Sequence, residues 1–362
     1  METKILTLFI PTYNMENYLR QCLDSLILAP EQMDQLEVLV INDGSRDNSS
    51  AIAHEYQDKY PETFRVIDKE NGNYGSCINC GLKEARGKYV KLLDADDHFY
   101  TKGFDIFLNY LSTIDVDLVL SNFITQGITG NCLKIKRYRL EPWKVLNFCD
   151  VCLDSSLENI MMQGVCYRRD LLLRIGYKQI EGISYTDTEW VFKPLASVKT
   201  VYFIDVFVYC YLLGRPGQTV ALKSYKKSVK SLLKVAYSNI EFFKGLDQSL
   251  NSFVHEYLEA ELKYIIDMIY SFGILYHGLS NRELLEFDQF LKASKMKIYD
   301  NIPSLKINFY RYPFVERWRH DPLNYKLPMI IRFILPIKIS AKKFKYFRKN
   351  HFGNLKRDEW QS

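Results

Sequence analysis

Short apolar runs alternate with amphipathic stretches along the first 125 residues, and this alternation restricts the folds that the chain can adopt. The apolar runs predict buried strands, because they are short and are broken by turn-forming residues. Five strands are predicted, at residues 5–10, 36–41, 64–67, 89–93 and 117–123, with helices at 14–28, 48–60, 76–85 and 101–111. Repeated strand–helix–strand units place parallel strands in one sheet. We therefore expect an α/β fold with a mostly parallel sheet flanked by helices.

The pattern changes after this region. Between residues 126 and 220 it is mixed, and a helix and two strands are predicted there, at 188–196, 201–204 and 206–211. From about residue 224 the spacing of apolar residues is helical throughout. We therefore expect a main domain over residues 1–220 and a helical C-terminal appendage over residues 221–362.

Each of the first four predicted strands is followed by a polar segment. These segments cover residues 11–14, 43–45, 69–75 and 94–97. Ligands of open α/β sheets bind at the carboxyl ends of the strands, where all four segments would lie. The sequence therefore predicts a ligand site at this edge of the sheet.

The fourth segment contains three acids in four positions. Asp94, Asp96 and Asp97 in "KLLDADDHFY" repel one another at neutral pH. The run has three interpretations: a helix cap, a solvated turn, or a set of ligands for a divalent cation. Its place at the expected site favours the cation over a solvated turn.

Four stretches carry a resemblance to a known family. They are "FIPTYNMENYLRQCLDSL", "EVLVINDGSRDNS", "NYGSCINCGLKEARGKYVKLLDADD" and "YTDTEWVF", in this order. Together they resemble the successive motifs of family 2 glycosyltransferases with the GT-A fold, over about residues 4–220. The resemblance implies a Rossmann-like GT-A domain and inverting, metal-dependent transfer from a nucleotide-sugar donor. It also implies that residues 1–125 bind the donor and that residues 126–220 supply the acceptor side and the base.

The resemblance assigns the acidic run to metal and donor binding. Asp96 would bind Mn²⁺ or Mg²⁺, Asp94 would face the metal or the donor ribose, and Ala95 between them would contact the donor. A divalent cation neutralises the donor diphosphate while the bond between sugar and phosphate breaks. The cluster is unfavourable alone and becomes favourable with metal and diphosphate in place.

Further donor contacts follow from the same resemblance. Asp43 would accept a hydrogen bond from N3–H of uracil, which favours a UDP-sugar, and Pro11, Tyr13 and Glu16 would frame the base. Tyr13 and Glu16 also have ordinary interpretations, as a packed ring and as a first-turn acid favoured by the helix dipole. Gly75 would permit close backbone approach to the donor, or make a turn.

The base that takes the proton from the acceptor hydroxyl is expected at the start of a helix. In the family this base is the acid of a Glu-Asp pair, and Asp187 aligns with it. Thr186 stands where the glutamate of the pair is usual, so Glu189 is a rival base. Asp187 could also serve as a helix cap. Trp190, one turn along, is expected in the core rather than stacked on a sugar.

The segment "LLGRPGQT" follows the last predicted strand. Arg215 and Gln218 lie beside Gly214 and Gly217, as in a mobile segment that folds over a diphosphate. The alternative is a plain basic loop.

The last forty residues are strongly basic. Residues 323–362 hold ten lysines and arginines and two acids, although the whole chain has a net charge of only +5. The stretch "LPMIIRFILPIKISAKKFKYFRKN" mixes these with apolar residues, which suits an anionic membrane surface. The alternative is a helix packed on the main domain with a solvated basic face. No nucleic-acid-binding motif is recognised.

Neither a secretory signal nor a run of about 20 apolar residues is visible. We therefore expect a cytoplasmic protein, peripheral at the inner face of the cell membrane, with a lipid-linked or glycan acceptor. Two other functions compete with glycosyl transfer. A sugar nucleotidyltransferase would show an early Gly-rich loop followed by Arg, but Pro-Thr-Tyr-Asn follows Ile10. A non-catalytic, membrane-associated polysaccharide-binding protein would not need all four of its site acids: Asp43, Asp94, Asp96 and Asp187.

Overall fold

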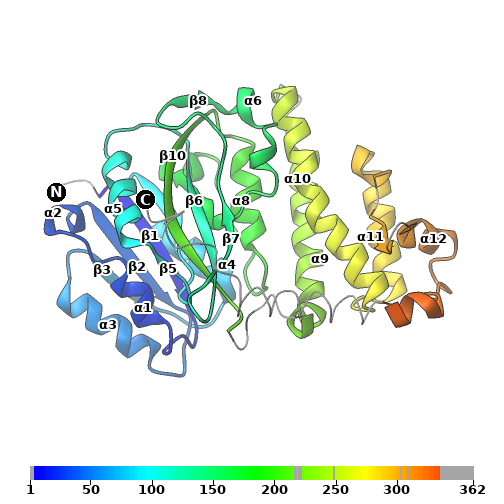
Figure 1. Ribbon diagram of the computed structural model, residues 1–362, viewed down its shortest axis with the longest axis horizontal. Coiled ribbons are helices and arrows are strands. Elements are labelled where there is room, and N and C mark those ends of the chain that lie inside the picture. Colours follow the sequence, from blue (N-terminus) through cyan, green and yellow to red (C-terminus); the bar gives the residue numbers. More distant parts are fainter. Residues whose placement is uncertain are drawn as a thin grey trace. The chain divides into compact units, whose positions relative to one another are not determined.

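The computed structural model describes residues 4–215, 218, 222–247, 249–301, 303–307 and 310–334. For residues 222–228, 305–307 and 310 it describes only the backbone. The chain divides into two compact units, and the division falls between residues 214 and 215. The first unit contains the large sheet, and the helices α9 to α12 belong to the second (Figure 1).

The first half of the large sheet is parallel. Its strands are β1 (Leu6–Thr12), β2 (Leu36–Asn42), β3 (Phe64–Asp68) and β4 (Tyr89–Leu92). They lie in the order β3-β2-β1-β4 and all pair in parallel. The apolar runs that predicted β1, β2 and β4 are buried almost throughout. The four predicted strands are confirmed in place and direction.

The second half of the sheet is mixed. Its strands are β5 (His98–Phe99), β6 (Leu118–Gly127), β7 (Cys132–Lys136), β8 (Val145–Asn147), β9 (Val165–Arg168) and β10 (Thr200–Leu213). Strand β9 lies antiparallel between β4 and β6, and β10 runs parallel to β6. The two strands expected at 201–204 and 206–211 form one strand, β10, with register shifts near Ile204 and Phe207. The expected α/β class with a mostly parallel sheet is confirmed.

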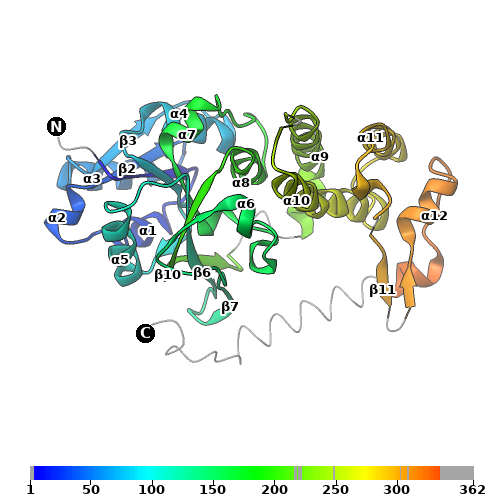
Figure 2. The same ribbon diagram turned by 90° about the horizontal axis from the view of Figure 1, so that it is seen from above.

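Helices cover both faces of this sheet. They are α1 (Leu19–Asp24), α2 (Pro30–Met33), α3 (Ser49–Lys59), α4 (Asn73–Glu84), α5 (Thr101–Leu111), α6 (Phe148–Val151), α7 (Arg169–Arg174) and α8 (Asp187–Leu195). Helix α4 lies on one side of the sheet, and α1 and α5 lie on the other (Figure 2). The connections between the strands therefore cross both faces of the sheet. Because β1 to β4 are parallel, the polar segments that follow them lie at one edge.

The helix expected over residues 14–28 is wrong at both ends, because α1 covers only Leu19–Asp24. Asn14 has a left-handed backbone, with φ of 54°. The next backbone N–H groups donate to side chains rather than to a helix: Met15 to Ser49 Oγ and Glu16 to Asp47 Oδ2. The loop after β2 and the first residue of α3 thus hold the loop after β1, and α1 begins only at Leu19.

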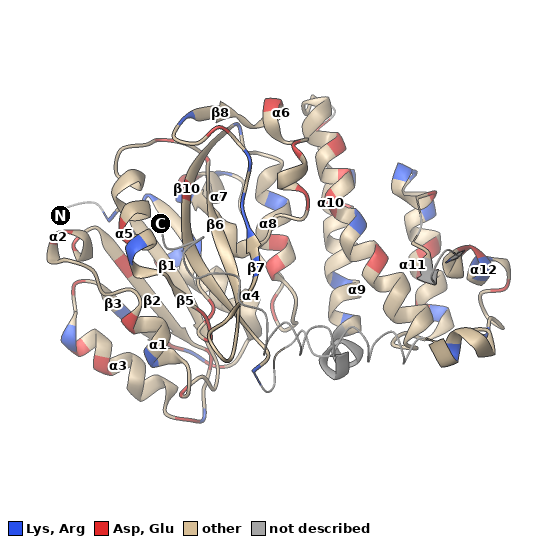
Figure 3. Cartoon of the chain, viewed as in Figure 1, with Lys and Arg blue, Asp and Glu red and all other residues tan. Residues whose placement is uncertain are grey.

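In its described residues, the regular structure of the second unit is helical apart from a small hairpin. It contains α9 (Leu222–Lys244), α10 (Ser252–Tyr270), α11 (Asn281–Ala293), α12 (Phe314–His320), β11 (Leu305–Ile307) and β12 (Tyr310–Tyr312). The antiparallel hairpin corrects the expectation of helix throughout. Buried Asp288 accepts hydrogen bonds from Arg319 Nε at 2.7 Å and Tyr270 Oη at 2.5 Å, which joins three helices. Charges of both signs are spread over these helices (Figure 3).

Among the described residues, no helix is both long enough and apolar enough to cross a membrane.

Candidate active site

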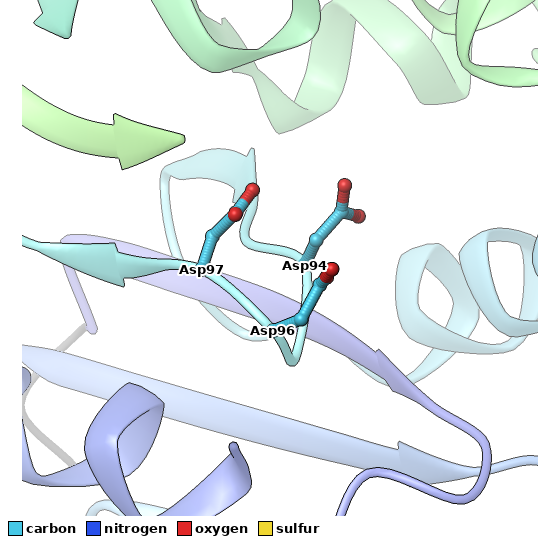
Figure 4. A group of neighbouring side chains, drawn as sticks. All are labelled: Asp94, Asp96 and Asp97. Atoms are coloured by element: carbon cyan, nitrogen blue, oxygen red, sulfur yellow. The ribbon is translucent and has the colours of Figure 1, made fainter. Parts of the chain in front are cut away.

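Three carboxylates gather in the loop between β4 and β5. Asp94, Asp96 and Asp97 each offer an oxygen, and these oxygens lie within 4.8 Å of one another (Figure 4). The backbone N–H of Asp97 donates to the carbonyl of Asp94 at 2.9 Å, which closes the turn. Magnesium and manganese prefer oxygen ligands, and Mg²⁺ is commonly held by one or two carboxylates. The donor set therefore fits a hard divalent cation.

Asp97 has a structural task in this turn. Its side chain is buried and accepts hydrogen bonds from Tyr209 Oη at 2.7 Å and from the backbone N–H of Leu212 at 2.7 Å. Burial, with the nearby charges of Asp96 and Asp94, raises the pKa of Asp97 well above its usual range. These bonds tie the acidic turn to the end of β10, so Asp97 does not cap a helix.

Asp94 is held from two other elements. Tyr74 Oη, on α4, donates to Asp94 Oδ1 at 2.8 Å. The backbone N–H of Asp94 donates to Tyr209 Oη at 3.1 Å. Ala95 between the two acids is buried. The orientation of the Asp94 carboxylate thus depends on a tyrosine that the sequence did not single out.

Asp43 follows β2 and is buried at the same edge of the sheet. Its Oδ1 accepts hydrogen bonds from Lys69 Nζ at 2.6 Å and from the backbone N–H of Gly72 at 2.9 Å. No described residue donates to Oδ2 of Asp43. The side chain is therefore fixed through one oxygen, and the other can accept a hydrogen bond from a ligand.

The three residues expected to frame the nucleobase of the donor lie in different surroundings. Pro11 pairs in register with Ile41 within the sheet, and Tyr13 is an exposed aromatic just after β1. Glu16 Oε2 instead accepts hydrogen bonds from Asn48, from the backbone N–H at 3.1 Å and from Nδ2 at 2.8 Å. Glu16 therefore holds Asn48, the residue before α3. Its alternative interpretation as a first-turn acid is wrong, because Glu16 precedes α1 and the first turn of α1 contains no acid.

Helix α8 begins at Asp187, and burial raises the pKa of this acid. Two residues on, Glu189 is fully buried and already paired: Oε2 accepts from the backbone N–H of Ile180 at 2.9 Å, and Oε1 pairs with Lys193. Trp190 packs edge-on against Tyr167, with the ring centroids 5.6 Å apart, and is buried as expected for the core. The geometry favours Asp187 over Glu189 as the base.

Two tyrosines connect the acidic turn with Asp187. Burial raises the pKa of Tyr74, and the charges of Asp94 and Asp187 raise it further. Burial likewise raises the pKa of Tyr211, with further contributions from Asp97, Asp94 and Asp187. Such charge effects weaken with distance, so each hydroxyl lies near acids of both groups. Asp187 and the acidic turn therefore lie within electrostatic range of the same two hydroxyls, and their union in one catalytic site stays a prediction.

Gly75 lies close to the backbone of another segment of the chain. A Cβ atom on Gly75 would lie 1.9 Å from the carbonyl oxygen of Ile180. The carbonyl of Gly72 also accepts a hydrogen bond from the backbone N–H of Gly182 at 2.9 Å. The start of α4 is therefore packed against the segment that leads into α8, which explains this glycine without a ligand.

The segment after β10 is partly described. Gly214 has φ of 102°, Arg215 follows it, and Gln218 is buried. Residues 216–217, including the Gly217 of the expected mobile segment, lie outside the described residues, as do residues 219–221. The diphosphate-binding role of Arg215 and Gln218 stays a prediction.

Comparison with known proteins identifies related sequences. Residues 7–148 match the family model described as glycosyl transferase family 2. The uncharacterized glycosyltransferase YibD of Escherichia coli is 31% identical over 219 residues, covering 58% of this chain and 62% of its own. The minor teichoic acid biosynthesis protein GgaB of Bacillus subtilis is 31% identical over 173 residues, covering 44% and 19%. The chain thus spans less than two thirds of the length of these relatives.

The fold also has solved counterparts. The crystal structure of S. aureus TarS 1–349 in complex with UDP-GlcNAc has a TM-score of 0.59 and 18% sequence identity. The likeness covers 82% of this chain and 89% of that one. At this identity it speaks for the fold alone, and it confirms the expected GT-A architecture.

Proposed function

Since the chain belongs to glycosyltransferase family 2, we propose that it transfers a sugar from a UDP-sugar to a hydroxyl of a lipid-linked or polysaccharide acceptor, with inversion at the anomeric carbon. One observation carries this proposal: Tyr74 Oη donates to Asp94 Oδ1 in the acidic turn, and burial and then the charges of Asp94 and Asp187 raise the pKa of this hydroxyl, so the cation ligands and the candidate base would share one site. A cation site beside a base is the arrangement that metal-assisted glycosyl transfer requires.

The donor would be bound by two sets of acids. Asp96 and Asp94 would hold Mn²⁺ or Mg²⁺, which when bound neutralises charge on the donor diphosphate. Asp43, fixed through Oδ1, would accept a hydrogen bond from the base through Oδ2. A carboxylate there suits the N3–H donor of uracil, because only an acceptor can pair with it.

Asp187 would take the proton from the acceptor hydroxyl as that oxygen attacks the anomeric carbon. Its raised pKa makes the ionised carboxylate a stronger base than an exposed aspartate. Glu189 is engaged by Ile180 and Lys193 and would hold α8 in place. The two acids of this helix therefore have different tasks.

The proposed donor and pathway agree with one structural neighbour and one relative. TarS was solved with UDP-GlcNAc, and GgaB is named for teichoic acid biosynthesis. We accordingly propose a hexosyl- or N-acetylhexosaminyltransferase of cell-surface glycan synthesis.

A panel of nucleotide sugars, assayed for UDP release with and without acceptor and with Mn²⁺ or EDTA, tests the function. A glycosyltransferase releases UDP faster with acceptor and needs the metal. A nucleotidyltransferase would instead join a nucleoside triphosphate and a sugar 1-phosphate with release of pyrophosphate, or would cleave a sugar nucleotide with pyrophosphate in the reverse direction. If no donor of the panel releases UDP and the protein binds saccharides, the non-catalytic alternative is favoured.

The second unit supports a further proposal: the protein binds peripherally to an anionic membrane. Met329, Ile330 and Phe333 expose 74%, 67% and 69% of their surface, and Lys326 and Arg332, which are near them in the sequence, are exposed as well. We call Met329, Ile330 and Phe333 the apolar patch. Apolar side chains flanked by basic ones suit the boundary of an anionic leaflet. Most of the basic tail, from residue 335 on, lies outside the described residues.

A further inference from the structure

Residues at the start of α4 contact Asp43, Asp94 and the segment that leads to Asp187. The backbone N–H of Gly72 donates to Asp43 Oδ1 at 2.9 Å. Two residues later, Tyr74 Oη donates to Asp94 Oδ1 at 2.8 Å. Gly75 then packs against the carbonyl of Ile180, on the segment leading to Asp187.

The backbone between these contacts has an unusual conformation. Asn73 has φ of 65°, a left-handed conformation that asparagine adopts more readily than most residues. On either side of Asn73, the amide of Gly72 donates to Asp43 and the hydroxyl of Tyr74 donates to Asp94. A short segment thus serves two acids that follow different strands.

The hydroxyl of Tyr74 is also confined by its neighbours. Met162 Sδ lies 3.3 Å from Tyr74 Oη. The turn that carries Met162 is anchored by the buried Lys91, whose Nζ donates to the carbonyls of Gln163 at 2.7 Å and Val165 at 3.1 Å. A tyrosine held in this way has little freedom to leave Asp94.

We propose that Tyr74 is a positioning residue for the metal site: its hydrogen bond fixes the orientation in which Asp94 meets the cation. This inference rests on the proposed function, in which Asp94 and Asp96 hold the metal. Hydrogen bonds to a ligating carboxylate orient it, and their loss typically weakens metal affinity about 10- to 100-fold. Tyr74 would act through Asp94 and would not touch the reacting atoms.

The test compares Tyr74→Phe with Tyr56→Phe. Tyr56 Oη donates to Asp24 Oδ1 at 2.6 Å, so the control loses the same kind of bond in another part of the domain. Calorimetry would measure Mn²⁺ affinity in the presence of UDP, and UDP affinity in EDTA. Tyr74→Phe should weaken Mn²⁺ binding at least about 10-fold and leave metal-free UDP binding unchanged. Tyr56→Phe should change neither.

A double-mutant cycle with Asp94→Asn then tests whether Tyr74 acts through Asp94. The double variant should bind Mn²⁺ no more weakly than Asp94→Asn alone. Additive losses, or unchanged Mn²⁺ affinity in Tyr74→Phe, would overturn the inference while leaving the proposed function intact. Wild-type protein that binds UDP equally with Mn²⁺ and with EDTA would contradict both.

Discussion

The carboxylate of Glu189 accepts a hydrogen bond from the backbone N–H of Ile180 at 2.9 Å, across the turn that precedes α8. The other oxygen pairs with Lys193, one helical turn along. Because the side chain is fully buried, both interactions are shielded from water. Glu189 therefore holds the helix that presents Asp187, and the two acids can be separated by experiment.

Asp187→Asn should lower turnover by at least about 10²-fold and leave UDP affinity nearly unchanged, because general-base catalysis contributes about 10²- to 10⁴-fold. Single-turnover rates and UDP titrations measure the two quantities. Normal turnover in Asp187→Asn, with an inactive Glu189→Gln, would show that the base is misassigned.

Glu189→Gln should affect stability more than turnover. Glutamine can still accept from Ile180, but Lys193 loses its charged partner in a largely buried setting. Breaking a buried ion pair costs about 3–5 kcal/mol, and partial exposure of Lys193 places this case near the lower end. Urea unfolding of the variant checks the loss. A free energy of unfolding equal to that of the wild type would contradict this role.

At low pH, the dependence of kcat/KM on pH should follow the ionisation of Asp187. Burial raises its pKa above the usual value near 4, and only the ionised form can take a proton. The rate should therefore fall as the pH drops through this raised pKa, earlier than for an exposed aspartate. Measuring kcat/KM against pH would show this fall in the wild type, and Asp187→Asn should lack it.

Asp96→Asn should abolish metal-dependent donor binding. The variant removes one of the three carboxylates that lie within 4.8 Å of one another. Asp115→Asn is a charge-matched control, because Asp115 is exposed and its ion pairs are worth little. UDP titrations with Mn²⁺ and with EDTA compare the two. Full metal dependence in Asp96→Asn would contradict the assignment of the cation site.

The sequence was informative where a side chain follows directly from its strand. Asp43 and Asp94 both follow predicted parallel strands, so their meeting at one edge could be expected. The pair of Glu189 with Lys193 also had a signal, because residues four apart face each other on a helix. That spacing would have removed Glu189 as a rival base.

Other features depend on contacts between distant segments. Tyr74 meets Asp94 only because α4 and the loop after β4 take particular orientations, which no local pattern encodes. Strand β9 is four residues long and lies antiparallel between β4 and β6, although alternating units favour parallel neighbours. Glu16 was expected to frame the nucleobase of the donor, which stays a prediction, and its contact with Asn48 could not be foreseen because it depends on how the loops after β1 and β2 meet.

The last prediction concerns the apolar patch of Met329, Ile330 and Phe333. Truncation before this patch is a poor test, because Leu327 and Ile331 are buried and their loss would disturb the second unit. Changing the three patch residues to serine keeps the chain intact, and Phe253→Ser with Tyr264→Ser removes exposed aromatic residues of α10 as a control. Each basic residue near an anionic leaflet contributes about 1 kcal/mol, and the patch adds apolar burial. Wild-type protein and control should therefore co-sediment with anionic liposomes at low salt and less at high salt, while the patch variant binds more weakly and still releases UDP from its donor. Equal sedimentation of patch variant and wild type would show that this surface does not contact the membrane.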